Sequence, residues 1–267
     1  MSVLGIVRLY SPRAKEKIRS LIEKHLSNHQ VESVTDHMLT CVDELVKNGI
    51  KANYKYVLIR EELEEKIKSG QISNQYKVED ILSDRNLLNE FAKDQIDLKG
   101  HTAHVRKILT QEAKVISLKN KVQNENRKYT TEEYALIKSF KELLSIRKKI
   151  RNYGAKVMVR MNETWGALNI EITNNAPILD NDLDRIIKKR HEFKEYADKG
   201  EETMFFINNM DDSDGGSGLG YATIDASIRE LGMDPLKAIT LISVSNTTVL
   251  LYFKIDGLKK YMTKTTA

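Results

Sequence analysis

The period of the hydrophobic pattern changes once along this chain, near residue 155, and that change constrains the fold most. Beyond it, apolar and polar residues alternate over 156–161 and 167–173, and again over 238–244 and 249–255. Two alternating runs separated by a few turn residues are typical of a β-hairpin. Strands that arrive as hairpins pair antiparallel. We therefore expect an α+β fold, a two-layer sandwich of a mixed, largely antiparallel sheet with helices on one face.

The chain is expected to begin with a short strand within Val3–Tyr10. From there to about residue 155 the hydrophobic pattern is mostly helical. Ser11 followed by Pro12 is a helix start, because serine caps free N–H groups and proline suits the first turn. A second helix begins near Thr35 and runs past Asn53. From about 55 to 150 the chain is rich in Glu, Lys, Leu and Ile and has no proline, which predicts a large all-helical insertion. The expected units are 1–54, with the N-terminal helices, 55–150, the insertion, and 151–267, the remainder of the sandwich.

Composition narrows the class of protein. The net charge is +5 and the pI about 9.0, but the lysines are spread along predicted helices, which favours a solvated surface over a nucleic-acid partner. One cysteine, Cys41, excludes an intrachain disulfide and indicates a reducing compartment. No secretory signal is visible over Met1–Tyr10, and no window reaches the length of a membrane span. These features predict a cytoplasmic protein without a membrane partner.

A glycine-rich run leads directly into a helical pattern at 214–232. Its four glycines, Gly215, Gly216, Gly218 and Gly220, allow close backbone approach, and the free N–H groups of a following helix can bind an anion. No Lys-Ser or Lys-Thr follows, and no βαβ unit surrounds the run, so neither a Walker loop nor a dinucleotide fingerprint fits. The alternative is a flexible linker. Leu219 within the run and the helix that follows immediately both argue against a linker.

A second polar constellation lies in the second helix. Glu44, Asn48 and Lys51 are spaced i, i+4 and i+7, so they line one face, with Lys47 and Lys55 at its edges. A solvated polar face on an amphipathic helix is the plain alternative. An asparagine followed by a glycine in mid-helix is locally unfavourable, however, and such conflicts occur where a site is built.

Three segments resemble the histidine kinase-like ATPase superfamily, which includes gyrase B, the heat-shock protein 90 chaperones, MutL and the sensor histidine kinases. The segment Glu44-Leu-Val-Lys-Asn-Gly-Ile-Lys-Ala52 resembles its N-box. The run Gly215-Gly-Ser-Gly-Leu-Gly220 resembles its later glycine box, in the form found in the histidine-kinase catalytic domain. Between them, Asn169–Leu179 stands where the family has a strand ending in D-x-G-x-G. The likeness covers about 30–55 and 154–256.

The resemblance implies a role for each matching residue. Asn48 would bind Mg²⁺, Lys51 would contact a phosphate, and Glu44 would orient or deprotonate the nucleophile as the catalytic residue. Asn174 would read adenine in place of the family's Asp, which removes a charge-assisted hydrogen bond, and Ala176 and Ile178 replace the two family glycines. The nucleotide would be cradled by the glycine box, and a mobile lid over 188–217 would cover it. The implied phosphate-binding residues of that box are Gly216, Gly218, Leu219 and Gly220.

The implied function is ATP binding with Mg²⁺, followed by phosphotransfer to a partner protein or by ATP hydrolysis. Whether the chain is an enzyme stays open. A self-contained sensor kinase is not expected, because none of the six histidines is followed by the acidic, basic and proline residues of a phosphoacceptor helix. The alternative is a regulatory or scaffold protein with a degenerate nucleotide site that acts through its helical insertion. A homodimer is compatible with either interpretation.

Overall fold

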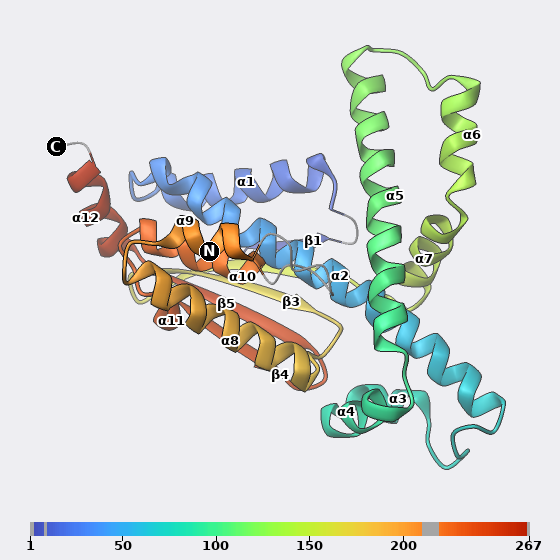
Figure 1. Ribbon diagram of the computed structural model, residues 1–267. Coiled ribbons are helices and arrows are strands. Elements are labelled where there is room, and N and C mark those ends of the chain that lie inside the picture. The colour runs from blue at the N-terminus through green and yellow to red at the C-terminus, as the bar shows by residue number, and fades with distance from the viewer. Residues whose placement is uncertain (1–2, 8–9, 210–218, 266–267) are drawn as a thin grey trace.

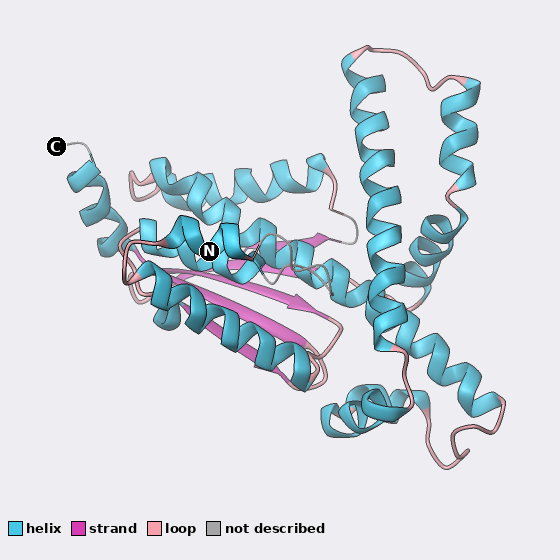
Figure 2. Ribbon diagram, in the orientation of Figure 1, coloured by secondary structure: helices cyan, strands magenta, loops and turns pink. Residues whose placement is uncertain are grey.

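The computed structural model describes residues 3–7, 10–209 and 219–265, and it contains one five-stranded sheet (Figures 1 and 2). The strand order is β1-β2-β3-β5-β4, and every neighbouring pair is antiparallel. The expected α+β sandwich is confirmed, and its sheet is antiparallel throughout. The strands are β1 (Val3–Val7), β2 (Val157–Thr164), β3 (Ala167–Asn174), β4 (Ile239–Ser243) and β5 (Thr247–Lys254).

One face of the sheet carries the core. In β5, buried residues alternate with half-exposed ones, and its register places Val249 opposite Ile172 and Leu251 opposite Ile170. These side chains share one hydrophobic core with helices α1 (Pro12–Ser27), α2 (Thr35–Lys68) and α10 (Leu219–Glu230). The other face exposes polar positions such as Arg160 and Thr240. The chain therefore has helices on one face of its sheet, as alternation predicts.

Local signals place the helix ends. The Ser11 side chain accepts a hydrogen bond from the Ala14 backbone, and Pro12 occupies the first turn of α1. A short 3₁₀ turn, η1 (Glu32–Val34), leads into α2. After the sheet's first hairpin come α8 (Asp180–Ala197) and α9 (Glu202–Asn208), and α11 (Pro235–Ala238) and α12 (Ile255–Thr265) flank the last hairpin.

The expected helical insertion is present, and α2 leads straight into it. This helix has 34 residues and crosses the predicted boundary at 54/55 without interruption. Beyond it, α3 and α4 pack on the end of α2 around a small core of their own that includes Leu63, Ile81 and Leu88. The last three helices rise away from the sheet as an arm, residues 98–152 (Figure 1). The insertion helices are α3 (Val78–Ser83), α4 (Arg85–Asp94), α5 (Leu98–Asn124), α6 (Thr131–Ser139) and α7 (Lys141–Asn152).

The foot of the arm is joined to the sandwich. Ile108 of α5 and Ile146 of α7 belong to the same core as the sheet. A buried polar network accompanies them: the Tyr54 hydroxyl lies 3.1 Å from both Glu112 carboxylate oxygens, and an Arg147 guanidinium N–H donates to the same carboxylate at 3.0 Å. Burial and the neighbouring Glu112 raise the pKa of Tyr54. The arm and the sandwich therefore meet through both apolar and hydrogen-bonded contacts on α2.

Among the described residues, no helix combines the length and the apolar character that crossing a membrane would require. Cys41 is fully buried in the core, and burial raises the pKa of its thiol to about 12. A thiol that stays protonated is a poor nucleophile, so Cys41 is a packing residue.

Candidate nucleotide site

The unfavourable glycine in mid-helix, Gly49, is explained by how closely α2 approaches the sheet. A Cβ at this position would lie 3.0 Å from Cγ2 of Val157 in β2 and 3.3 Å from Cβ of Asn174 in β3. Such distances leave no room for a side chain without movement of the strands. Gly49 thus brings the polar face of α2, which carries Asn48, down to the end of β3.

The start of α10 lies against the same polar face. A Cβ built on Gly220 would be 3.2 Å from Nδ2 and 3.7 Å from Oδ1 of Asn48, and 3.3 Å from Oε2 of Glu44. Gly220 is the second residue of α10, so its surroundings include the free N–H groups of a helix N-terminus. The structure therefore brings Glu44, Asn48 and Gly220 together, although more than 170 positions of sequence separate the two segments.

Charge on this face is arranged around Glu44. The Lys47 ammonium donates to Glu44 Oε1 at 2.6 Å, and both side chains are partly exposed. Lys51, one turn further along, is exposed and has no ion pair with any described residue. Lys55 is 3.4 Å from Asp182 of α8. The arc thus presents one available cation, Lys51, beside an asparagine and a carboxylate.

Asn174 ends β3 and is 7% exposed. Its Nδ2 donates to the Ala176 carbonyl at 3.0 Å, so the amide nitrogen is engaged by its own loop. The Thr247 hydroxyl donates to the same carbonyl at 2.7 Å. Asn53 of α2 accepts a hydrogen bond from the Asn175 backbone at 3.0 Å. The loop is therefore fixed from three elements, and Asn174 keeps only its Oδ1 as an acceptor for another group.

Asn53 and Thr247 were not identified as site residues from the sequence. Asn53 is buried at 3% exposure and lies five residues beyond Asn48, outside the i, i+4, i+7 series. Thr247 is the first residue of β5 and lies on the face that the alternating pattern predicts to be buried. Threonine is common in half-buried strands, so its presence there does not indicate a site. A polar residue at an inward position of a core strand is the only sequence signal that points to it.

Helix α8 is bound to α10 by an ion pair and by a cluster of aromatic side chains. The Arg190 guanidinium makes two parallel bonds to Asp225, with N–O distances of 2.9 Å, and also donates to the Pro235 carbonyl at 3.0 Å. Burial raises the pKa of Asp225, while Arg190 opposes the rise. Next to this pair, Phe193 and Phe205 pack edge to face with ring centroids 5.3 Å apart. Of the predicted lid over 188–217, the part up to Asn209 thus forms helices packed on α10.

Several predicted residues lie outside the described part of the chain. Gly216 and Gly218 of the glycine box are among them. Leu219 and Gly220 are described, and Leu219 packs against the aromatic cluster of α8 and α9. The described part of the candidate site therefore consists of residues from α2, β3 and the start of α10.

The donor set at this place suits Mg²⁺ better than a transition metal. Asn48 and Glu44 both bring a side-chain oxygen near Gly220: a Cβ built there would lie 3.7 Å from Asn48 Oδ1 and 3.3 Å from Glu44 Oε2, with Asn48 Nδ2 closer, at 3.2 Å. Mg²⁺ takes oxygen ligands and commonly uses one or two from the protein, completing its shell with water and phosphate. The described residues contain no cluster of three or more His, Cys, Asp and Glu that could hold a metal. The oxygen pair fits a cation that is shared with a phosphate.

A buried acid adjoins the site on the opposite side of α2. Asp43 is 5% exposed and pairs with Lys15 of α1 at 2.5 Å, while its Oδ1 has no hydrogen-bond partner among the described residues. Burial raises the pKa of Asp43 to about 6; Lys47 opposes the rise and Glu44 adds to it. Asp43 faces α1 and not α10. It interacts with the candidate site only electrostatically, through Lys47 and Glu44.

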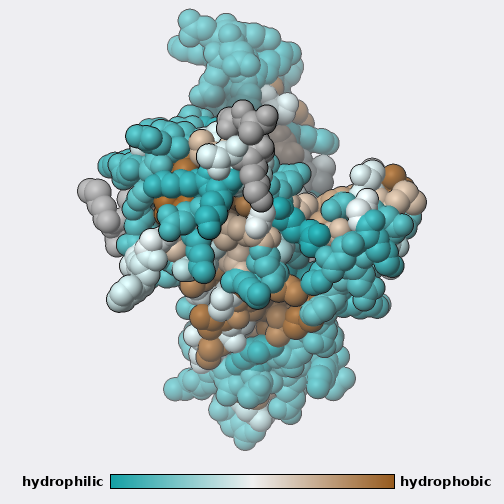
Figure 3. Space-filling model, turned by 90° about the vertical axis from the view of Figure 1, so that its left-hand side faces the viewer, coloured by the Kyte–Doolittle hydropathy of each residue, from teal (hydrophilic) through white to brown (hydrophobic). Residues whose placement is uncertain are grey.

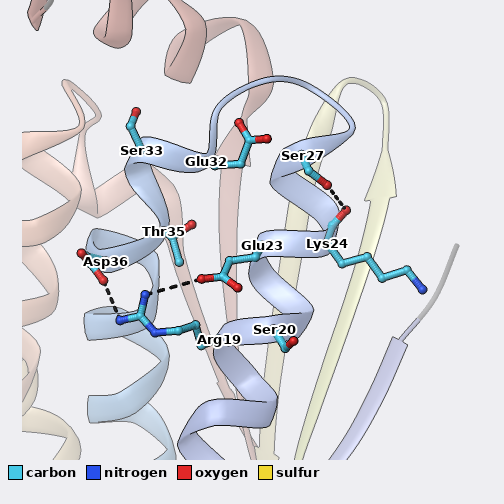
Figure 4. A pocket seen from close by; sticks show the side chains of 9 residues that line it. All are labelled: Arg19, Ser20, Glu23, Lys24, Ser27, Glu32, Ser33, Thr35 and Asp36. Atoms are coloured by element: carbon cyan, nitrogen blue, oxygen red, sulfur yellow. Dashed lines mark hydrogen bonds and ion pairs between the residues drawn. The ribbon is translucent and has the colours of Figure 1, made fainter.

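A polar groove of about 550 Å³ lies away from this site, between α1 and the start of α2 (Figure 4). Three of its charged groups pair with one another: Arg19 donates to Asp36 at 2.7 Å and lies 3.6 Å from Glu23. The groove is open and all of its lining residues are polar or charged, so it is a poor candidate for a small-molecule site.

A scan against protein-family models finds no match, and searches of the curated proteins and of the solved structures find none either.

Proposed function

We propose that this chain binds an adenine nucleotide with Mg²⁺ where the polar face of α2 meets the start of α10, as the histidine kinase-like ATPases do. The observation that carries the proposal is the approach of Gly220 to Asn48 and Glu44. The helix N-terminus offers N–H donors that suit a phosphate, and the neighbouring amide and carboxylate offer oxygens that suit its cation. The nucleotide would support phosphotransfer to a partner protein or ATP hydrolysis, in the cytoplasm.

Each residue has a distinct part in this proposal. Asn48 Oδ1 would hold the cation, which would neutralise phosphate charge when bound. Lys51, exposed and unpaired among the described residues, would reach a phosphate as a point charge. Glu44 would orient the attacking hydroxyl or water once released from Lys47. Asn174 Oδ1 would accept a hydrogen bond from the adenine amino group.

Calorimetric titration with ATP, with and without Mg²⁺, tests the proposal directly. We expect micromolar to millimolar affinity, about −4 to −8 kcal/mol, and loss of the Mg²⁺ dependence in Asn48→Ala. Asn86→Ala is the matched control, because Asn86 is an exposed helix asparagine far along the chain in α4. Equal Mg²⁺ dependence in both variants and the wild type would contradict the role of Asn48.

Gly220→Ala provides a second, geometric test. The new methyl group would lie 3.2 Å from Asn48 Nδ2, so Asn48 and Glu44 would have to move. We expect roughly tenfold weaker ATP binding, a loss of about 1.4 kcal/mol. Gly257→Ala is the control, since the nearest atom to its Cβ is at 3.7 Å, an ordinary contact.

A scaffold with a degenerate site is the second candidate, and one observation favours it. Asn174 already satisfies its own loop by donating to Ala176, as expected of a turn residue with no ligand to read. Asn174→Asp separates the two. If Asn174 reads adenine, a charged acceptor should strengthen ATP binding by about 1 kcal/mol, or roughly fivefold. An unchanged affinity, together with no thermal shift in millimolar ATP, would support the scaffold.

A further inference from the structure

The solvent side of α5 carries a regular series of basic and polar residues. Lys107, Lys114 and Lys121 are seven positions apart, which keeps them on one side of a helix. Thr110, Ser117 and Asn124 lie three positions after each of them and complete the row. All six residues are exposed. We call this row the α5 stripe.

The exposed surface of α5 carries charge of one sign. Its exposed charged residues are all basic, and its single acidic residue, Glu112, is buried. Solvated helices usually mix both signs, because pairs of opposite charge four residues apart stabilise the helix. A helix of 27 residues whose exposed charges are all positive repels itself. Exposure to solvent alone does not explain this composition.

The whole arm shares this bias. Residues 98–152 contain fourteen Lys and Arg against five Asp and Glu, a net charge of +9. The whole chain has 43 Lys and Arg and 38 Asp and Glu. The residues outside the arm therefore hold 29 basic and 33 acidic residues, a net charge of −4. The arm's acids are also largely neutralised from within: Arg127 pairs with Glu133, and Lys107 with Glu142. Lys114, Lys119 and Lys121 have no ion pair among the described residues.

We propose that the α5 stripe is a binding surface for the phosphate backbone of double-stranded nucleic acid. Lysine, serine, threonine and asparagine are side chains that contact backbone phosphates without reading sequence. From Lys107 to Lys121 the helix extends about 21 Å, and a duplex rises about 3.4 Å per base pair, so the stripe spans about six base pairs. The expectation against nucleic acid rests on lysines that are spread along the helices, whereas the structure sets one row of them on a helix that projects from the sheet.

Other anionic partners suit this surface less well. Protein interfaces are depleted in lysine and depend on buried aromatic or arginine anchors, and α5 exposes no large hydrophobic residue. A membrane-surface helix needs a free apolar face, whereas Val105, Ile108 and Val122 of α5 are buried within the protein. The end of the arm, at the top of Figure 3, is almost uniformly hydrophilic on the side in view.

The test is binding of a fluorescent 20-base-pair duplex to the full chain, followed by anisotropy between 50 and 200 mM salt. The arm variant changes to Glu the stripe residues Lys114 and Lys121 and also Lys128, an exposed lysine of the arm just beyond the end of α5. The control changes Lys17, Lys199 and Lys237 to Glu, which are exposed lysines of the sandwich. Both change the net charge equally. We expect micromolar binding with a log–log salt slope of about −3, since each contact adds about −0.9, at least tenfold weaker binding in the arm variant, and less than threefold weakening in the control.

Four outcomes would overturn the proposal. They are absence of duplex binding at 50 mM salt, equal losses in the two variants, displacement of the duplex by poly-glutamate at the same charge concentration, and binding to anionic lipid vesicles with higher affinity than to the duplex. Thermal unfolding of each variant checks the fold. If the charge reversals unfold the arm, the corresponding Lys→Gln variant replaces them and must still bind at least threefold more weakly than its control.

Discussion

Asp43 of α2, in the sandwich, and Glu112 of α5, at the foot of the arm, are both buried carboxylates, and their surroundings differ. Glu112 of the arm accepts hydrogen bonds from Tyr54 and from Arg147. Asp43 of the sandwich has only Lys15, and its Oδ1 has no partner among the described residues. A buried polar group without a partner costs free energy. The carboxylate at the foot of the arm is therefore hydrogen-bonded by two side chains, whereas α2 in the sandwich keeps an unpartnered carboxylate oxygen beside the candidate site.

The two regions also differ in how tightly the backbone packs. At the site, α2 approaches β2 and α10 so closely that a methyl group at 49 or at 220 would displace neighbouring side chains. On the arm, α6 has no buried residue at all. Close packing fixes the positions of atoms at the candidate site, whereas α6 adds exposed surface to the arm without a core of its own.

The largest expected effect comes from breaking the network that joins the regions. Arg147→Ala leaves Glu112 charged and buried with only the Tyr54 hydroxyl, so we expect a loss of about 3–5 kcal/mol in the free energy of unfolding. Arg151→Ala, at an exposed position of the same helix, should change it by less than about 0.5 kcal/mol. Urea unfolding followed by far-UV circular dichroism measures both. Similar small effects would show that the network does not hold the arm.

The next effect is a pH dependence of the free energy of unfolding, caused by the buried Asp43 carboxylate, whose Oδ1 has no partner among the described residues. Its folded pKa of about 6 lies above the unfolded value of 3.8, so charging it destabilises the fold, with no penalty below pH 4 and the full penalty above pH 6. The advantage of Asp43→Asn over the wild type should therefore grow by about 3 kcal/mol from pH 4 to pH 7.5. Asp184→Asn, an exposed position, is the control. An advantage of Asp43→Asn that stays constant with pH would refute the raised pKa.

A smaller effect distinguishes close approach from ordinary packing. Gly49→Ala introduces a methyl group 3.0 Å from Val157, and overpacking of this kind costs about 1–3 kcal/mol. Gly257→Ala, in the helix α12 with space around it, should instead stabilise by up to about 1 kcal/mol through helix propensity. Thermal unfolding of the two variants gives opposite shifts if α2 is as close to the sheet as the structure places it. A stabilising Gly49→Ala would contradict that placement.

Much of the architecture follows from local sequence signals. The cap at Ser11, the two hairpins and the helical run without proline each depend on residues within a few positions of one another, and the structure confirms them. The continuity of α2 across the predicted boundary at 54/55 also agrees with its pattern. Local periodicity determines elements because each backbone conformation gives the chain its own repeat.

The sequence by itself thus determined an antiparallel α+β sandwich with a helical insertion, and it singled out Glu44, Asn48 and the glycine run. Only the tertiary structure decided that Gly220 meets Asn48 and Glu44, that Gly49 seats α2 on Asn174, and that Arg147 neutralises Glu112 across 35 positions. It also decided that α5, whose row of lysines follows from their seven-residue spacing, projects away from the sheet. These are relations between distant segments, fixed by how helices and strands pack, and the periodicity of a single element carries no information about its neighbour.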